Sequence, residues 1–224
     1  ALQNQTTGES NVAVGYNAGL SVTTGVQNTL IGGLAGDAIT TGYNNVAVGS
    51  DALGANTTGF GNVSVGANSM ITNTTGANNT ATGRYALYNN TTGANNVAFG
   101  LQGLFANTTA SNNTAVGYQS LLANTTGASN VAVGYLALDA NTTGAGNSAL
   151  GKGSLGANTT ASYNTGLGEN ALLTNTTGAS NTAVGNTALY ANTTASYNTA
   201  VGTSALAANT TGASNVALGK HSML

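Results

Sequence analysis

The 224-residue sequence contains no cysteine and a single histidine, His221. Without thiols, the chain has neither a disulfide framework nor a thiolate metal site. One histidine close to the end of the sequence cannot supply a Ser/His/Asp or Cys/His catalytic arrangement. We therefore interpret His221 as a variable surface residue and expect the protein not to be an enzyme.

Charge is nearly absent, because Asp, Glu, Lys and Arg together make up only 4% of the sequence. A net charge of -2 does not favour binding to nucleic acid, which requires several phosphates to be neutralised. There is also no polybasic segment for anionic lipid and no basic segment typical of a signal peptide. No apolar run approaches the roughly 18 residues that a membrane helix needs. We expect no nucleic-acid partner and no membrane insertion.

A 17-residue segment, 124–140, is repeated along the whole sequence without insertion or deletion. We number its positions 1 to 17, with Asn124 at position 1. The thirteen copies begin at residues 5, 22, 39, 56, 73, 90, 107, 124, 141, 158, 175, 192 and 209. A fixed period of this size is typical of a solenoid, in which each repeat packs on its neighbours. We treat residues 1–224 as a single array and, because both ends fall within a repeat, expect an excerpt of a longer one.

Four positions of the repeat never vary: positions 2 and 3 are Thr, position 7 is Asn and position 11 is Gly. An amide that recurs once per turn predicts a ladder in which each side chain bonds the next. A recurring glycine predicts a backbone geometry that a side chain would disfavour. The predicted ladder comprises Asn11, Asn28, Asn45, Asn62, Asn79, Asn96, Asn113, Asn130, Asn147, Asn164, Asn181, Asn198 and Asn215. The predicted structural glycines are Gly15, Gly32, Gly49, Gly66, Gly83, Gly100, Gly117, Gly134, Gly151, Gly168, Gly185, Gly202 and Gly219.

Short strands are the secondary structure that the repeat favours. Positions 8 to 10 are rich in β-branched and apolar residues and end at the invariant glycine, which predicts a strand. Positions 14 and 15, a small residue followed in most copies by Leu or Met, predict a second strand. We expect the side chains of positions 10 and 15 to form buried apolar columns. The small residues at positions 9 and 14 allow either a thin coil or close approach by another chain.

Other folds are disfavoured by composition. Repeated glycine, asparagine and β-branched residues oppose a helix, and the absence of Asn-Gly and Asp-Gly opposes antiparallel hairpins. The apolar residues keep fixed positions in every copy, which disordered chains do not show. The sequence therefore predicts an all-β fold, a parallel β-solenoid or β-roll of thirteen 17-residue turns.

The strand Asn-Val-Ala-Val-Gly, at residues 11–15, 45–49 and 130–134, resembles the head repeats of trimeric autotransporter adhesins. It is also similar to repeats of phage tail-fibre shafts. In the adhesin heads such strands build a left-handed β-roll, and three chains associate side by side. The resemblance thus implies a left-handed solenoid, a homotrimer and an extracellular location on a bacterial surface or a virion fibre. The 17-residue period is longer than that of the adhesin heads.

The function that we expect is structural, the shaft of an adhesin-like extracellular fibre without catalysis. The five carboxylates form no repeated pair for acid–base chemistry, and most copies lack the Asp that calcium-binding β-rolls repeat, so we expect no metal and no cofactor. The partner would be the chain itself, as a trimer or end to end in a filament. The alternative is a binding module for a cell-surface glycan or for ice, using exposed tyrosines or a column of threonines. The Asn-Thr-Thr triplets match the glycosylation pattern, but we interpret these asparagines as structural.

Overall fold

The computed structural model describes residues 1–223. It is an all-β parallel β-solenoid, which confirms the predicted fold class. Each coil takes up 17 residues, because residues paired between neighbouring strands are separated by one repeat, as in Val12 and Thr29. The chain divides into two compact units, residues 1–112 and the residues from 113 onward, and each is described by itself.

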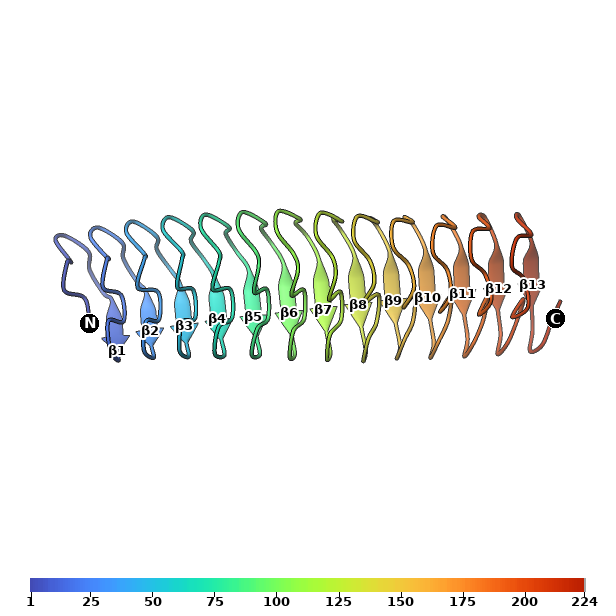
Figure 1. Cartoon of the computed structure of the whole chain (residues 1–224), viewed down its shortest axis with the longest axis horizontal. Helices are drawn as coiled ribbons and strands as arrows, with labels where there is room; N and C mark the ends of the chain where they lie inside the picture. The colour runs from blue at the N-terminus through green and yellow to red at the C-terminus, as the bar shows by residue number, and fades with distance from the viewer. Residues whose placement is uncertain (224) are drawn as a thin grey trace. The chain divides into compact units, whose positions relative to one another are not determined.

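Each coil contributes one three-residue strand at positions 8 to 10, in agreement with the prediction for this segment. In the first unit the strands are β1 (Val12–Val14), β2 (Thr29–Ile31), β3 (Val46–Val48), β4 (Val63–Val65), β5 (Thr80–Thr82) and β6 (Val97–Phe99). In the second unit they are β7 (Thr114–Val116), β8 (Val131–Val133), β9 (Ser148–Leu150), β10 (Thr165–Leu167), β11 (Thr182–Val184), β12 (Thr199–Val201) and β13 (Val216–Leu218). Within each unit the strands are parallel and lie side by side in chain order (Figure 1).

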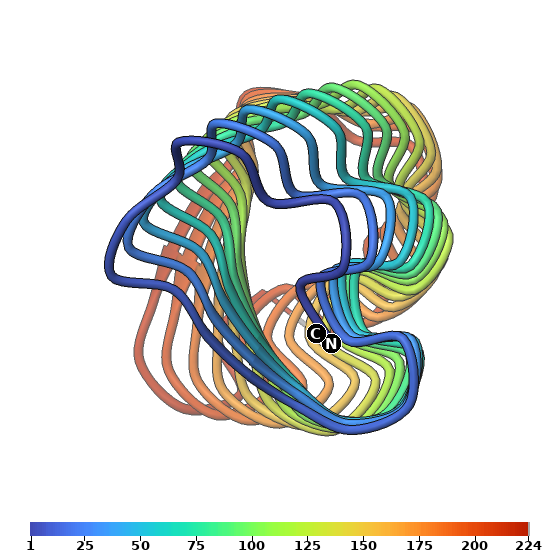
Figure 2. The same cartoon turned by 90° about the vertical axis from the view of Figure 1, so that its left-hand side faces the viewer.

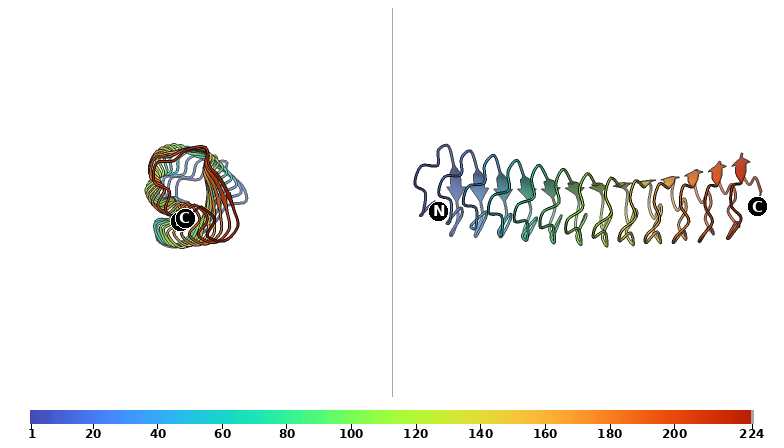
Figure 3. Two further views of the ribbon diagram at one scale, coloured as in Figure 1. Left: turned by 90° about the vertical axis from the view of Figure 1, so that its right-hand side faces the viewer. Right: turned by 90° about the horizontal axis from the view of Figure 1, so that it is seen from above.

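Each strand residue pairs with the residue 17 positions further along the chain, so equivalent positions of successive repeats lie next to each other. Val131 of β8, for example, pairs with Ser148 of β9, and Val133 pairs with Leu150. Seen end on, the coils of the first unit follow one another with nearly the same outline (Figure 2). The strands of the second unit turn gradually from one to the next (Figure 3), as expected for the twist of a β-sheet.

The second predicted strand, at positions 14 and 15, does not form. In every described coil, positions 12 to 17 make a turn segment with left-handed backbone at positions 13 and 15, such as φ 52° at Leu136 and φ 54° at Leu138. Two left-handed residues separated by one residue are incompatible with an extended strand. The prediction was wrong because a small residue followed by leucine shows which side chains are buried, but not the backbone path.

The interior of each coil is filled by positions 9, 14 and 15. In the coil of β8, Ala132, Ala137 and Leu138 are all fully buried. Because side chains alternate along a strand, an inward position 9 directs positions 8 and 10 outward. The predicted buried column at position 10 is therefore wrong, and Phe99 is 55% exposed. The small residues at positions 9 and 14 face the inside of a thin coil and not another chain.

Enlarging the interior alanine of a strand should destabilise the solenoid. We expect Ala132→Leu to lower the free energy of unfolding by about 1–3 kcal/mol, because a well-packed interior does not accept extra methylene groups without strain. Ala213 is exposed and lies outside the strand, so the same change there, Ala213→Leu, should alter stability by less than about 0.5 kcal/mol. Urea denaturation of both variants measures the difference. Equal effects would contradict the inward assignment of position 9.

Candidate functional site

The asparagines of position 7 form a buried hydrogen-bond ladder. Asn45 Nδ2 donates to Asn28 Oδ1 at 3.1 Å and to the Gly59 carbonyl at 2.9 Å. Asn45 Oδ1 in turn accepts from the backbone N–H of Asn62 at 3.0 Å and from Asn62 Nδ2 at 3.1 Å. The Asn45 amide therefore joins three consecutive coils, and its donors and acceptors are satisfied inside the protein. Asn198 departs from this pattern, because its buried Nδ2 has no hydrogen-bond partner. The fully buried members are Asn28, Asn45, Asn62, Asn79, Asn96, Asn113, Asn130, Asn147, Asn164, Asn181 and Asn198.

A second ladder runs along position 1, which the sequence analysis took only as structural asparagine. Asn141 Nδ2 donates to Asn124 Oδ1 at 2.8 Å and to the Gly144 carbonyl at 2.9 Å. Asn158 Nδ2 continues the chain to Asn141 Oδ1 at 3.0 Å. In the folded protein the fully buried amides of these triplets are not accessible to a glycosylating enzyme, whereas Asn209 is only partly buried. The fully buried members are Asn56, Asn73, Asn90, Asn107, Asn124, Asn141, Asn158, Asn175 and Asn192.

The two threonines that follow have different surroundings. At position 2, Thr142 Oγ1 donates to the carbonyl of Thr159 at 3.1 Å, and the same bond recurs between other neighbouring coils. At position 3 the threonine is exposed in every coil. Within each unit the repeat thus presents one outward column of threonines.

The outer face of each sheet is uncovered within the chain. Position 10 carries apolar side chains except for Thr82, and position 8 carries Val, Thr or Ser. These side chains point outward. In the second unit Val131, Leu150 and Leu167 are 42%, 48% and 40% exposed, and they line a shallow hollow of about 270 Å³. Contiguous exposed apolar surface of this kind marks a place where a protein contacts another molecule.

Aromatic side chains form stacks because equivalent positions of neighbouring coils are adjacent. The rings of Tyr118 and Tyr135 lie 5.4 Å apart with an angle of 11° between their planes. Tyr43 and Phe60 stack at 4.9 Å. Each pair occupies the same repeat position in neighbouring coils, position 12 for Tyr118 and Tyr135 and position 5 for Tyr43 and Phe60.

A groove of about 400 Å³ opens on the turn side of the second unit. Its floor is formed where one coil has glycine at both position 13 and position 16, while the neighbouring coils have larger residues. It is lined by Tyr135, Leu136, Asp139, Lys152, Gly153, Gly156, Ala157, Asn170, Leu173 and Thr174. No pattern considered in the sequence analysis predicted this groove. The sequence feature that could have indicated the groove is a pair of glycines, Gly153 and Gly156, at positions where adjacent repeats have larger side chains.

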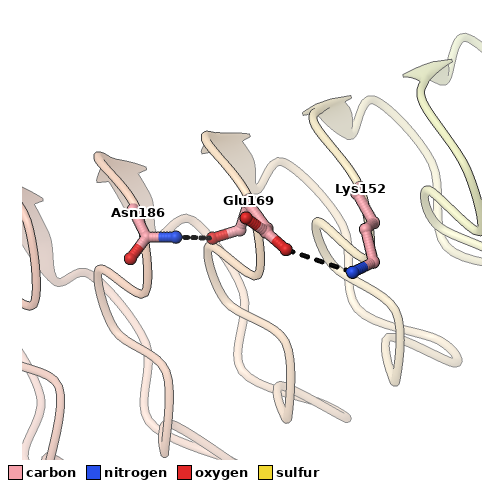
Figure 4. Close-up of polar contacts among 3 residues, drawn as sticks. All are labelled: Lys152, Glu169 and Asn186. Atoms are coloured by element: carbon pink, nitrogen blue, oxygen red, sulfur yellow. Dashed lines mark hydrogen bonds and ion pairs between the residues drawn. The ribbon is translucent and has the colours of Figure 1, made fainter.

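The charges around the groove are nearly balanced. Lys152 Nζ lies 3.2 Å from Glu169 Oε1, and Asn186 Nδ2 donates to the Glu169 carbonyl at 3.4 Å (Figure 4). Both members of this ion pair are well exposed, so the pair contributes less than about 1 kcal/mol to stability. Asp139 is half-buried, and burial raises its pKa above the ordinary carboxyl value, while hydrogen bonds from the backbone N–H groups of Asp139 and Ala140 partly oppose the shift.

The raised pKa of Asp139 predicts a pH-dependent contribution to stability. The folded protein holds the Asp139 carboxyl proton more tightly than the unfolded chain does. The resulting contribution to folding stability is fully present below the ordinary carboxyl pKa and is lost as the pH rises through the raised pKa. We expect the stability of Asp139→Asn relative to the unmodified protein to increase as the pH rises through the ordinary carboxyl pKa and then through the raised pKa of Asp139. Burial also raises the pKa of Asp37 in the first unit, so Asp37→Asn should respond in the same direction.

Urea denaturation of both variants at several pH values measures these differences. A stability difference that does not change with pH would contradict the raised pKa.

The remaining chemistry-bearing residues are dispersed. His221 is exposed near the end of the described chain. Among residues 1–223, no group of three or more His, Cys, Asp or Glu side chains is placed to hold a metal ion. The same residues include no helix of the length and hydropathy that would cross a membrane.

No protein-family model matches this chain, and no curated protein or solved structure matches it either.

Proposed function

We propose that this chain is a structural segment of an extracellular fibre, in which three copies associate side by side through the outer faces of their sheets. The location, on a bacterial surface or a virion, follows from the resemblance of the Asn-Val-Ala-Val-Gly strands to adhesin heads and tail-fibre shafts. In this role the chain provides length and stiffness and does no chemistry. Filaments formed end to end are part of the same proposal.

The observation that carries this proposal is the uncovered, mostly apolar face at positions 8 and 10. In each unit every strand adds side chains to this face, and residues such as Leu150 and Leu167 remain 48% and 40% exposed in the single chain. Burying apolar surface contributes roughly 25 cal/mol per Å², so association of identical faces is favourable. The two asparagine ladders supply the stiffness, since each coil is bonded to both neighbours through its side chains as well as its backbone.

Sedimentation equilibrium tests the association. One chain has a mass of 21.7 kDa, and we expect the protein in solution to have three times this mass. The double variant Leu150→Glu/Leu167→Glu should dissociate to single chains, because it places charge in the apolar face. Thr143→Glu, at the exposed position 3, is the control and should keep the mass of the unmodified protein. A single-chain mass for the unmodified protein at all concentrations would refute the trimer.

A second candidate function, ice binding, is favoured by the exposed threonine column at position 3. Threonine lies outward there in every coil, so the surface repeats with the spacing of the coils, roughly 4.8 Å. An ice-binding surface should produce thermal hysteresis, and one bulky residue in the column, Thr126→Tyr, should abolish it. If the protein acts only as a shaft, neither the unmodified protein nor Thr126→Tyr should produce thermal hysteresis.

A further inference from the structure

We propose that the groove bounded by Tyr135, Asp139 and Asn170 binds one neutral hexopyranose unit of a carbohydrate. This binding activity goes beyond the structural role, because it concerns one place in the array and not the regular repeat. The groove lies entirely within the second unit and spans three consecutive coils. Its size, about 400 Å³, is in the range of small-molecule sites.

The first step of the argument concerns the ring of Tyr135. One face of this ring stacks on Tyr118 of the preceding coil. The groove is lined by Tyr135 and by residues of the two coils that follow it. The ring face opposite Tyr118 is therefore the one that lines the groove. In the next coil Lys152 occupies the repeat position of Tyr135. Its side chain extends toward Glu169 in the coil after that and so does not stack on the Tyr135 ring (Figure 4). The ring therefore offers a flat apolar surface, 50% exposed, on which the C–H face of a pyranose can pack.

The second step concerns the floor, which is open because two side chains are missing. A Cβ atom on Gly153 would lie 2.6 Å from Asn170 Oδ1, and one on Gly156 would lie 3.0 Å from Leu173 Cδ1 and 3.5 Å from Asp139 Oδ1. The two glycines thus bring the carboxylate of Asp139 and the amide of Asn170 to the edge of one apolar floor. A few polar groups around an apolar surface are the usual composition of a small-molecule site.

The third step selects the kind of ligand. The Asp139 carboxylate accepts hydrogen bonds and the Asn170 amide both donates and accepts, which matches neighbouring sugar hydroxyls. Lys152 lines the same groove, but its charge is paired with Glu169, so a cationic ligand attracted by Asp139 is the alternative that a cationic probe has to test. An anionic ligand would meet Asp139 at the floor and Glu169 beside Lys152. A neutral ligand with one apolar face and hydroxyls at its rim fits this arrangement.

The array contains an internal comparison six repeats earlier. Asp37, Gly54 and Asn68 occupy in the first unit the repeat positions that Asp139, Gly156 and Asn170 occupy in the second. The aromatic surface and the empty floor are missing from this earlier set. In that set, Gly33, Ser50 and Asp51 take the places of Tyr135, Lys152 and Gly153. We therefore expect carbohydrate binding at the later set only.

The test uses the full chain and four probes, the methyl glycosides of glucose, galactose, mannose and N-acetylglucosamine. Saturation-transfer NMR followed by calorimetric titration should detect at least one of them, with a Kd on the order of 1 mM. Gly156→Leu should weaken binding at least tenfold by filling the floor. This change suits the backbone, because position 16 is leucine in other coils, such as Leu122 and Leu173. Tyr135→Ala should weaken binding to the same extent.

Matched controls separate loss of the site from loss of the fold. Gly54→Leu makes the same change at the equivalent position of the first unit and should leave binding unchanged. Tyr16→Ala removes a tyrosine from the same repeat position as Tyr135, outside the groove, and should also leave binding unchanged. Tetramethylammonium serves as a cationic probe. Binding of none of the four glycosides, undiminished binding by Gly156→Leu, or displacement of the sugar by tetramethylammonium would overturn the proposal.

Discussion

Replacing Gly49 with alanine is expected to lower the free energy of unfolding by at least about 3 kcal/mol. Gly49 has φ +137°, a backbone conformation that residues with side chains rarely adopt. A Cβ atom at this position would lie 2.7 Å from both the carbonyl carbon and the carbonyl oxygen of Gly66 in the next coil. These are backbone atoms held by the sheet, so they cannot move aside without breaking the pairing of the two coils.

Gly33→Ala is the matched control for this prediction. Gly33 lies in the adjacent coil, and a Cβ atom there would meet no other atom within 4 Å. The same chemical change should therefore alter stability by less than about 0.5 kcal/mol. Chemical denaturation followed by circular dichroism compares the two variants. If Gly33→Ala proved as destabilising as Gly49→Ala, the contact with the next coil would not be the reason that position 11 is always glycine.

Replacing Asn45 with serine is expected to cost about 3–5 kcal/mol, because four hydrogen bonds of its buried side chain are lost at roughly 1 kcal/mol each or more. The shorter hydroxyl cannot span the distance between coils, so the buried N–H of Asn62 loses its acceptor. Asn28 Oδ1 and the Gly59 carbonyl each lose one donor. The loss affects both neighbouring coils, and we expect hydrogen exchange to accelerate on both sides of the substitution.

The adjacent asparagine provides the control. Asn44 is exposed, at position 6, where several repeats have serine. Asn44→Ser should therefore change stability by less than about 0.5 kcal/mol and leave hydrogen exchange unaltered. The two variants contain the same substitution in neighbouring residues, so composition and net charge are identical. Similar losses in both would show that the ladder contributes little.

The period and the parallel stacking could be predicted from the sequence, because a repeat without insertions leaves few ways to cover an apolar strand. The sequence could not predict which face of the strand is buried. A strand such as Val131–Val133 has a small residue between two larger ones, and period-2 alternation fits either face equally. The width of the coil determines which side chains of the strand point inward. Leu138 from the turn segment already fills the interior and leaves room only for Ala132.

The candidate sites were predictable to different degrees. The Asn45 ladder follows from the invariance of position 7, whereas the ladder through Asn141 was not predicted, because position 1 is not asparagine in the first three repeats. The carbohydrate groove depends on which positions share one side of the coil. Gly153 and Gly156 are separated by two residues in sequence, and their common surface depends on the left-handed backbone of the turn segment, which composition does not reveal.

The asparagine ladders also give the solenoid a direction. Where the amides of a ladder bond each other, the nitrogen of one coil donates to the oxygen of the coil before it, as Asn45 does to Asn28 and Asn141 does to Asn124. Asn198, whose Nδ2 has no partner, interrupts this pattern in the second unit. The dipoles of the bonded amides are thus aligned, in the same way that peptide dipoles add along a helix. A coil stacked in the reverse orientation would place donor against donor and acceptor against acceptor. A further coil stacked in the same orientation would extend both ladders, whereas a coil in the reverse orientation would interrupt them, so the two ends of each stack differ in the groups that they offer.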